Sequence, residues 1–270
     1  MDRGPLTDAE SRRRDLARIE AALLAAGRLL AEYARRDLEV EEKRPGDPVT
    51  EADRAADALL RETLLAGSPA GEPEGWLSEE TADDPVRLER RRVWIVDPLD
   101  GTREFVSAIP EWCVSIGLVE DGRPVAGGIY NPLAERLILG AEGLGVTLDG
   151  EPAAVTGRPT LDGATVLASR SEVGRGEWDR FEGGVFRVEP TGSVAYKLGL
   201  VAAGLADATW TLRPKNEWDV AGGAALVLAA GGAVRLPAGD TPTFNRPRPW
   251  LPGFLAANER IADALPGILR

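Results

Sequence analysis

The sequence predicts an α/β (α+β) protein built from two unlike halves, and three observations support this class. Residues 8–38 show helical periodicity, apolar runs at 113–119 and 125–130 flank a turn, and strands alternate with helices after about residue 160. We therefore expect an N-terminal half, residues 1–150, in which helices pack on a mostly antiparallel sheet. A smaller α/β half should follow over residues 151–270.

Two helices are expected near the N-terminus. Within residues 8–38, apolar side chains recur at helical spacing on one face: Leu16, Ile19, Ala22, Leu23, Leu29, Leu30 and Tyr33. The polar stretch 41–48 should end this helix, and a second helix is expected over 52–65. Residues 68–75 are rich in Gly and Pro and are expected to form a loop.

Four strands are expected in the rest of the first half. The apolar run 93–96 is typical of a buried strand. The runs 113–119 and 125–130 are separated by the turn residues 120–123 and predict a hairpin. Residues 137–141 should add a fourth strand.

The second half alternates between the two kinds of element. Strands are expected at 164–168, 185–188, 210–212 and 233–236, and helices rich in small apolar residues at 194–204 and 220–230. Alternation of this kind is typical of an α/β arrangement.

Composition excludes several classes of function. The formal net charge of −12 is not that of a nucleic-acid-binding protein, and histidine is absent, which excludes histidine bases and histidine metal ligands. No apolar run reaches the roughly 18 residues needed to cross a bilayer, so we expect no membrane association. The polar start of the sequence predicts a cytoplasmic location. The single Cys113 cannot form an internal disulfide and is expected to be a core residue.

Residues 94–102 carry the clearest chemical signal. An apolar strand leads directly to Asp97 and Asp100, and Gly101-Thr102 then opens a predicted helix. Ligands gather where strands end, and backbone N–H groups at a helix start favour a phosphate. If the turn is tight, both aspartates can enter one pocket and supply the oxygen ligands that hard cations prefer. The alternative is an ordinary acidic turn before a helix.

Three other acidic segments are ambiguous when taken singly. Glu79 and Glu80 follow Ser78 and could simply be exposed. Asp53 could complete a capping box with Thr50, which does not exclude a role in holding a metal-bound water. Asp219 precedes a Gly/Ala-rich helix and could be only its N-cap. Together with residues 97–102, these segments form a more specific pattern.

That pattern resembles the inositol monophosphatase superfamily. Residues 97–102, Asp-Pro-Leu-Asp-Gly-Thr, and residues 218–222, Trp-Asp-Val-Ala-Gly, match its two main motifs. Glu79-Glu80 matches the acidic pair of the family, with Ser78 where glycine is common, and Thr50 with Asp53, preceded by Lys43, matches its N-terminal element. The resemblance runs from about Leu16 to the C-terminus and implies a five-layer αβαβα sandwich of the sugar-phosphatase type, with the site between the halves.

The resemblance implies a phosphomonoesterase with two or three Mg²⁺ ions. One ion would be held by Glu79, Asp97 and the Leu99 carbonyl, a second by Asp97, Asp100 and Asp219, and a weaker third near Glu79 and Asp53. Glu79 and Thr102, backed by Asp53, would orient or deprotonate the attacking water. The implied substrate-binding residues are Asp100, Gly101, Thr102, Ser193, Lys197 and Asp219. Inhibition by Li⁺ and a possible homodimer are also implied.

The choice of phosphate ester depends on fewer residues. Residues 102–105, Thr-Arg-Glu-Phe, and Lys197 after Gly192-Ser193 resemble 3′(2′),5′-bisphosphate nucleotidases, because a lysine there could bind a second phosphate. Leu212 occupies a position where inositol phosphatases tend to have Glu. The expectation is therefore hydrolysis of adenosine 3′,5′-bisphosphate to AMP, with inositol monophosphate as the alternative substrate.

Rivals from other classes are less consistent with the sequence. A haloacid-dehalogenase phosphatase needs an aspartate where Pro98 stands, and a cysteine phosphatase needs an arginine where Val119 stands. A non-catalytic metal-binding or regulatory protein would be expected to lack a ligand, and no ligand is missing. The expected partner is a small phosphate ester.

Overall fold

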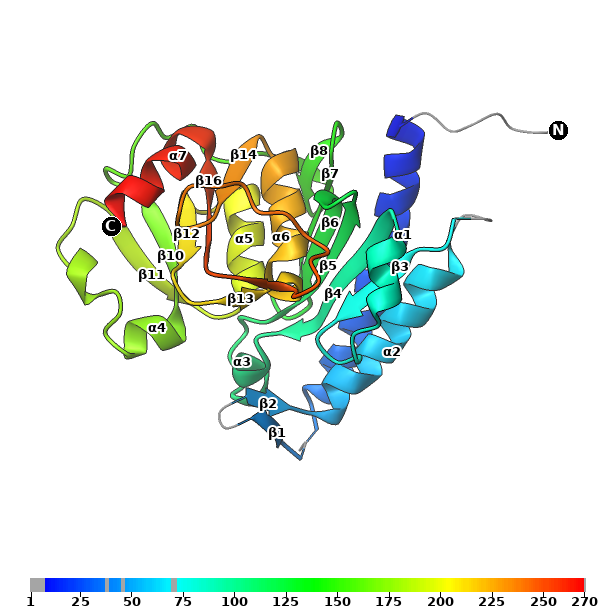
Figure 1. The fold of residues 1–270 in the computed structure, drawn as a ribbon. Coiled ribbons are helices and arrows are strands. Elements are labelled where there is room, and N and C mark those ends of the chain that lie inside the picture. Colours follow the sequence, from blue (N-terminus) through cyan, green and yellow to red (C-terminus); the bar gives the residue numbers. More distant parts are fainter. Residues whose placement is uncertain (1–7, 37–38, 45–46, 69–71, 270) are drawn as a thin grey trace.

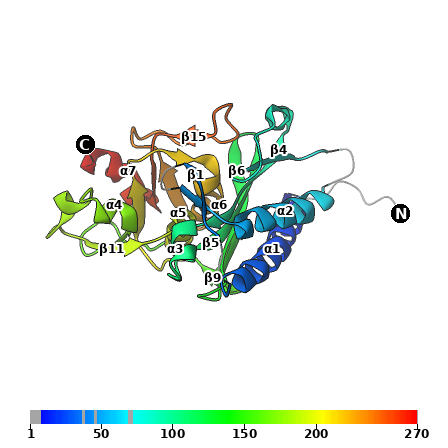
Figure 2. The same ribbon diagram turned by 90° about the horizontal axis from the view of Figure 1, so that it is seen from below.

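The computed structural model describes residues 8–36, 39–44, 47–68 and 72–269, and they form layers of helices and sheets. The first layer contains α1 (Asp8–Tyr33) and α2 (Glu51–Ala66), which lie side by side on one face of a seven-stranded sheet (Figures 1 and 2). Helices α5 (Val194–Ala202) and α6 (Glu217–Ala229) fill the space between this sheet and a second, five-stranded sheet. The far face of the second sheet packs on α7 (Glu259–Ile268). These layers confirm the predicted αβαβα sandwich.

The first sheet is antiparallel except at one edge. Its strands follow chain order: β3 (Gly75–Ser78), β4 (Arg92–Asp100), β5 (Cys113–Glu120), β6 (Arg123–Asn131), β7 (Arg136–Ala141), β8 (Gly145–Leu148) and β9 (Glu151–Ala153). Only the β3–β4 pair is parallel. The mostly antiparallel first sheet and the 113–130 hairpin are therefore confirmed.

The second sheet is mixed. Its spatial order is β11 (Arg187–Thr191), β10 (Thr165–Ser169), β12 (Ala208–Thr211), β16 (Phe254–Asn258) and β14 (Gly232–Arg235). Strand β10 is parallel to both neighbours, whereas β16 is antiparallel to β12 and β14. The carboxyl ends of β10 and β11 therefore open at one edge, where loops can carry functional side chains.

The remaining elements are short. They are the hairpin of β1 (Glu41–Arg44) and β2 (Asp47–Val49), the pair β13 (Lys215–Asn216) and β15 (Trp250–Leu251), helices α3 (Thr102–Val106) and α4 (Arg170–Gly174), and the 3₁₀ turns η1 (Pro85–Glu89) and η2 (Asp179–Phe181).

Several predicted boundaries were wrong. The first helix ends at Tyr33, where two successive i→i−3 hydrogen bonds tighten the last turn, and the 37–38 end of the prediction lies outside the described residues. The polar stretch 41–48 contributes to a hairpin rather than serving only as a helix stop. Strand β3, in and beyond the predicted 68–75 loop, and the C-terminal β16 and α7 were not predicted. Short apolar segments gain their strand pairing from neighbours distant in sequence, which periodicity does not reveal.

Helix α6 packs on the first sheet at backbone distance. A Cβ on Gly222 would lie 2.9 Å from the carbonyl oxygen of Ile116, and one on Gly117 would lie 2.8 Å from the Gly222 nitrogen. Larger side chains at these positions would push the helix away from β5. The small residues after Trp218-Asp219 therefore bring the start of α6 against the sheet that carries Asp97.

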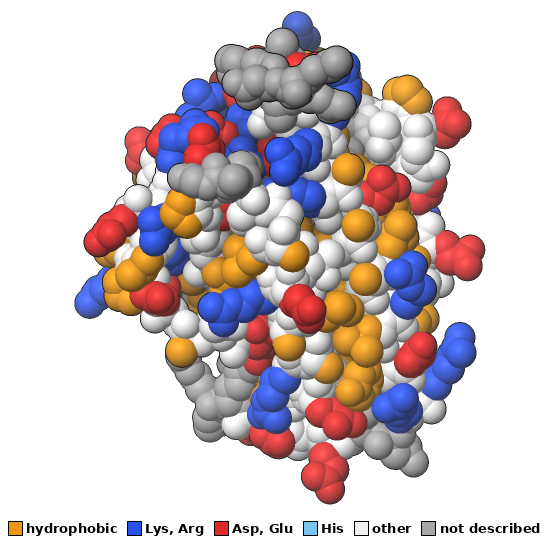
Figure 3. All heavy atoms as spheres, turned by 90° about the vertical axis from the view of Figure 1, so that its right-hand side faces the viewer, with side chains coloured by type: hydrophobic (Ala, Val, Ile, Leu, Met, Phe, Trp, Pro, Cys, Tyr) orange, Lys and Arg blue, Asp and Glu red, His pale blue; other side chains and the backbone are white. Residues whose placement is uncertain are grey.

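The charges on the outer face are mixed. Figure 3 views the molecule from the side of α1 and α2. Acidic and basic side chains are intermingled on this face, and no large basic patch is visible among the described residues. No helix of the part of the chain that the structure describes is both long and apolar enough to span a membrane.

Candidate active site

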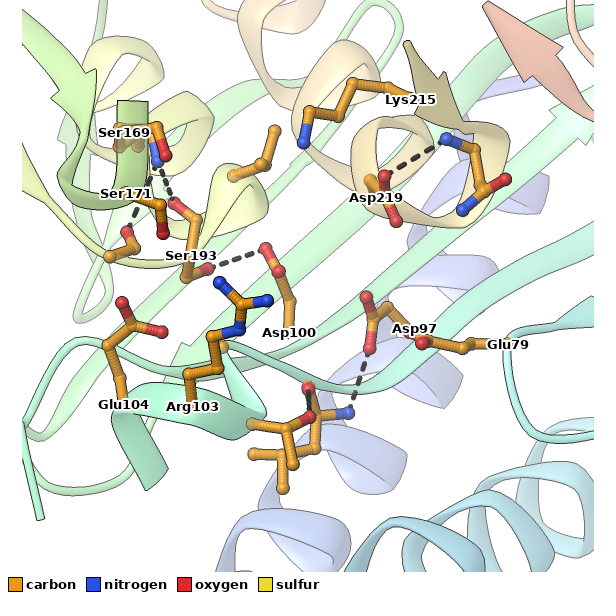
Figure 4. A pocket seen from close by; sticks show the side chains of 17 residues that line it. Glu79, Asp97, Asp100, Arg103, Glu104, Ser169, Ser171, Ser193, Lys215 and Asp219 are labelled. Atoms are coloured by element: carbon orange, nitrogen blue, oxygen red, sulfur yellow. Dashed lines mark hydrogen bonds between the residues drawn. The ribbon is translucent and has the colours of Figure 1, made fainter. Parts of the chain in front are cut away.

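A pocket of about 300 Å³ opens at the junction of the two sheets. It is lined by strand ends, helix starts and the loop after β3: Glu79, Asp97, Leu99, Asp100, Gly101, Thr102, Arg103, Glu104, Ser169, Ser171, Gly192, Ser193, Val194, Lys197, Lys215, Asn216 and Asp219. Of the site residues predicted from the sequence, all except Asp53 line this pocket. Segments far apart in the sequence thus meet at one polar cavity (Figure 4).

A β-bulge places both aspartates of the 97–102 segment at the pocket. Asp97 is opposite Ser115 and Asp100 is opposite Cys113, so three steps along β4 match two steps along β5. On a regular strand, residues three apart point to opposite faces, and one extra residue corrects this alternation. After the bulge, Gly101 has φ 99°, and a Cβ there would lie 3.1 Å from the Glu111 carbonyl oxygen. Glycine fits this position because any other residue would be strained by the positive φ and by the contact of its Cβ with this oxygen.

Three carboxylates converge in this pocket. Single oxygens of Glu79, Asp97 and Asp219 all lie within 4.8 Å of one another, and Asp97 is only 2% exposed. They come from the loop after β3, from β4 and from the first turn of α6 (Figure 4). Oxygen ligands from separate segments at this spacing suit a hard divalent cation such as Mg²⁺.

The electrostatics of the trio also fit a cation. Burial raises the pKa of Asp97 well above its usual range, and the facing charges of Glu79, Asp100 and Asp219 raise it further. Burial likewise raises the pKa of Asp219 to about 7, although the nearby Lys215 opposes this. Ionised carboxylates at such a site repel one another unless a positive charge compensates them. The donor set therefore fits Mg²⁺, which would supply that charge.

Asp100 lines the same pocket but lies outside the trio defined by mutual proximity. Its Oδ2 accepts hydrogen bonds from the Ser193 hydroxyl at 2.7 Å and from the Ala195 backbone N–H. Ser193 is the N-cap of α5 and has φ 51°, an uncommon conformation for a residue other than glycine. Asp100 thus ties the end of β4 to the start of α5 at the pocket.

Asp53 lies behind the pocket and reaches it through Thr102. The Thr102 hydroxyl lies 3.0 Å from Asp53 Oδ1 and 3.2 Å from the Leu99 carbonyl oxygen. The other oxygen of Asp53 accepts hydrogen bonds from the backbone N–H and the hydroxyl of Thr50, both at 2.8 Å. The predicted capping box at the start of α2 is confirmed.

Lys197 is buried, 4% exposed, and is committed to the backbone. Its Nζ donates to the carbonyl oxygens of Ser193 at 2.7 Å, Thr191 at 3.2 Å and Gly192 at 3.5 Å. Burial lowers the pKa of Lys197 to about 8, against the opposing charge of Asp100. An ammonium group has three protons, and all three have acceptors in this arrangement.

Some pocket residues were not predicted as site residues. Ser169 is the last residue of β10, and Ser171 lies in α4. Lys215 lies in β13, and the buried Glu104 lies in α3. Burial raises the pKa of Glu104. The two serines could have been found from the sequence, because they directly follow the predicted strand 164–168. Nothing in the sequence favours Lys215 over Arg213 as a site residue. The structure places Lys215 at the pocket, whereas the Arg213 guanidinium pairs with Glu177 at 2.7 Å.

The suggestion that Asp219 is an N-cap was wrong. The N-cap of α6 is Asn216, and Asp219 stands three residues later, where its Oδ2 accepts the Asn216 backbone N–H at 3.0 Å. The helix begins earlier than the predicted residue 220 because Glu217 and Trp218 belong to its first turn. The other Asp219 oxygen is not used in this hydrogen bond.

Comparisons with known proteins agree with this fold. The model of the inositol monophosphatase family matches residues 12–268. Inositol monophosphatase 3 of Solanum lycopersicum is 36% identical over 257 residues, 91% of this chain and 92% of that protein. Inositol-1-monophosphatase of Rhizobium meliloti is 31% identical over 92% of this chain and 93% of that protein.

A solved structure agrees as well. The extragenic suppressor protein suhB of Bartonella henselae superimposes with a TM-score of 0.81 at 31% identity, covering 94% of this chain and 97% of that one. The fold and these relatives therefore define the chain as a phosphatase. It belongs to the inositol monophosphatase family.

Proposed function

We propose that this protein is a Mg²⁺-dependent phosphatase that hydrolyses the phosphate monoester of inositol or a closely related polyol. The observation that carries the proposal is the convergence of Glu79, Asp97 and Asp219 within 4.8 Å in a polar pocket. Carboxylates so placed suit divalent cations, and two or three Mg²⁺ ions would be held there and near Asp100 and the Leu99 carbonyl. Residues 1–150 would supply most ligands, and residues 151–270 would supply Asp219 and substrate-binding groups.

The side chains have distinct proposed roles. Bound Mg²⁺ would supply positive charge that polarises the phosphate ester and favours attack by water. Glu79 would accept a proton from that water, and Thr102 would orient it. Asp53 would help to hold the Thr102 hydroxyl, whose single proton can be donated to the Asp53 carboxylate or to the Leu99 carbonyl, because both of these can only accept.

Two observations favour a polyol monophosphate. The relatives reported above include proteins named as inositol monophosphatases. The hydroxyls of Ser169 and Ser171 also line the pocket and are suited to hydrogen bonds with substrate hydroxyls. This order of substrates reverses the expectation from the sequence. That expectation relied in part on Lys197, whose ammonium group donates to three backbone carbonyls.

The bisphosphate nucleotide remains a second candidate because of Lys215. Its side chain lines the pocket, and its positive charge acts on Asp219 there. A lysine in such a place can bind a second phosphate as a compact cation. Arg103 also lines the pocket and adds positive charge.

One experiment tests both levels of the proposal. Phosphate release from inositol 1-phosphate and from adenosine 3′,5′-bisphosphate is measured with Mg²⁺ and again after chelation. We expect Mg²⁺-dependent turnover with a higher kcat/KM for inositol 1-phosphate. Faster hydrolysis of the bisphosphate would reverse the order of substrates. Absence of phosphate release from a panel of esters would instead favour a metal-binding protein without turnover. Millimolar Li⁺ is expected to inhibit.

A further inference from the structure

Helix α2 presents two buried carboxylates, one turn apart, to the site side of the molecule. Asp53 is 1% exposed and Asp57 is 7% exposed. Residues four apart lie on the same face of a helix. Asp53 binds the hydroxyls of Thr50 and Thr102, as described above. Asp57 was not among the residues predicted for the site.

Asp57 binds two hydroxyls of its own. Its Oδ1 accepts a hydrogen bond from Ser78, and its Oδ2 accepts one from Thr81. Ser78 is the last residue of β3 and is buried, and Thr81 lies three positions further along the loop. The two donors therefore flank Glu79, the one member of the carboxylate trio that a loop supplies.

The position of Glu79 needs such support. A loop residue has no repeating ladder of hydrogen bonds to fix its backbone, and ordering that backbone costs conformational entropy. Anchors on both sides remove much of this freedom before a ligand arrives. Side chains that orient metal ligands typically change metal affinity by about 10–100-fold when they are removed.

We propose that Asp57 is a positioning residue for the metal site. By accepting hydrogen bonds from Ser78 and Thr81, it holds the loop between them so that the Glu79 carboxylate meets Asp97 and Asp219. The inference rests on the proposed function, because it concerns the cation that the trio would hold. Asp57 does not itself belong to the trio and does not line the pocket.

A matched control separates positioning from general stability. Asp207 is also 7% exposed and also anchors neighbouring groups. It holds the Thr156 hydroxyl at 2.6 Å, the Thr165 backbone N–H at 2.7 Å and the Arg158 guanidinium at 3.2 Å. It anchors β10 and the segment before it rather than the loop that carries Glu79. Asp207→Ala should therefore remove a comparable buried anchor without moving a proposed metal ligand.

The test measures binding of Mn²⁺ to metal-free protein by calorimetry or by electron paramagnetic resonance, with urea unfolding in parallel. The proteins are the wild type, Asp57→Ala, the double variant Ser78→Ala/Thr81→Val, and Asp207→Ala. We expect a roughly tenfold or greater rise in the Mn²⁺ Kd for the first two variants. Asp207→Ala should stay within about twofold of the wild type. A fifth protein, the triple variant Asp57→Ala/Ser78→Ala/Thr81→Val, should bind Mn²⁺ no more weakly than Asp57→Ala, since the three side chains act as one unit.

The outcomes are distinguishable. If Asp57→Ala does not fold, the hydroxyl double variant carries the test, because it keeps the carboxylate and removes only its donors. A wild-type Kd in that double variant would overturn the inference and leave the proposed metal site intact. An equal rise in Asp207→Ala would overturn it as well, by showing an effect of stability alone. A wild-type protein that binds no Mn²⁺ would overturn the metal site and this inference together.

Discussion

The Thr102 hydroxyl lies 3.0 Å from Asp53 Oδ1, although 49 positions separate the two residues. The other oxygen of Asp53 caps helix α2 through Thr50. The two readings of Asp53 that the sequence left open, as part of a capping box or as a residue of the site, are therefore compatible. Each carboxylate oxygen serves one of them, and the helix cap fixes the oxygen that faces Thr102.

Removal of the Thr102 hydroxyl should impair turnover. Thr102→Val keeps the shape of the side chain and removes the group proposed to orient water, so kcat at saturating Mg²⁺ should fall by about 100-fold or more. Thr102→Ser should retain activity within about tenfold, because it keeps the hydroxyl. Thr63→Val is the control, since the Thr63 hydroxyl binds only the Leu59 carbonyl within α2. Unchanged kcat in Thr102→Val would remove Thr102 from the proposed machinery.

Asp97→Asn should abolish activity while the fold survives. Burial and three facing carboxylates raise the pKa of Asp97, so its ionised form destabilises the metal-free protein above its unfolded pKa of about 4. The neutral amide removes this cost, and the metal-free variant should unfold at the same or a higher Tm than the wild type. Mg²⁺ should raise the Tm of the wild type only. Differential scanning calorimetry with and without Mg²⁺ checks this, and an equal Mg²⁺ effect in both proteins would contradict it.

The two pocket lysines should differ in their effects. Lys197→Met removes three hydrogen bonds to the turn before α5, so kcat/KM should fall to a similar degree for inositol 1-phosphate and adenosine 3′,5′-bisphosphate. Lys215→Met should reduce kcat/KM by about tenfold more for the bisphosphate, because only that substrate has a second phosphate. Steady-state kinetics with both esters decide this. A selective loss in Lys197→Met would restore the role expected from the sequence.

Acid should destabilise the protein through Glu74, which does not line the pocket. The fully buried Glu74 side chain pairs with Arg18 and Arg92, and hydrogen bonds from Arg18 and Trp94 overcome its burial and lower its pKa to about 2. This depressed pKa contributes stability that is present above pH 4.5 and is lost as the pH falls towards 2. Glu74→Gln should lose roughly 3 kcal/mol at pH 7 and show a flatter dependence between pH 4.5 and 2.

Glu177 provides the matched comparison for Glu74. Hydrogen bonds from Arg213 and Arg175 also lower its pKa to about 2, but its side chain is 26% exposed. Solvent weakens such surface pairs, so Glu177→Gln should cost less than about 1 kcal/mol. Urea unfolding of both variants at several pH values measures the two effects. An equal loss of unfolding free energy in Glu177→Gln would contradict the explanation that burial makes the Glu74 ion pairs the stronger ones.

Much of the site could be predicted because its signals are local. The strand before Asp97, the capping box of Asp53 and the small residues after Asp219 each follow from neighbouring positions in the chain. The division of the chain near residue 150 stays a prediction. Strand β3 and the C-terminal β16 were missed, because each becomes a strand only when it pairs with a distant neighbour.

The sequence by itself determined the residue types: hard oxygen ligands, no histidine, and small residues where α6 meets the sheet. Only the tertiary structure decided which of these side chains meet. The bulge in β4 turned Asp97 and Asp100 to one pocket, and the burial of Lys197 committed its protons to backbone carbonyls. The physical reason is that local backbone preference is encoded in short segments, whereas distances between segments depend on how the layers pack.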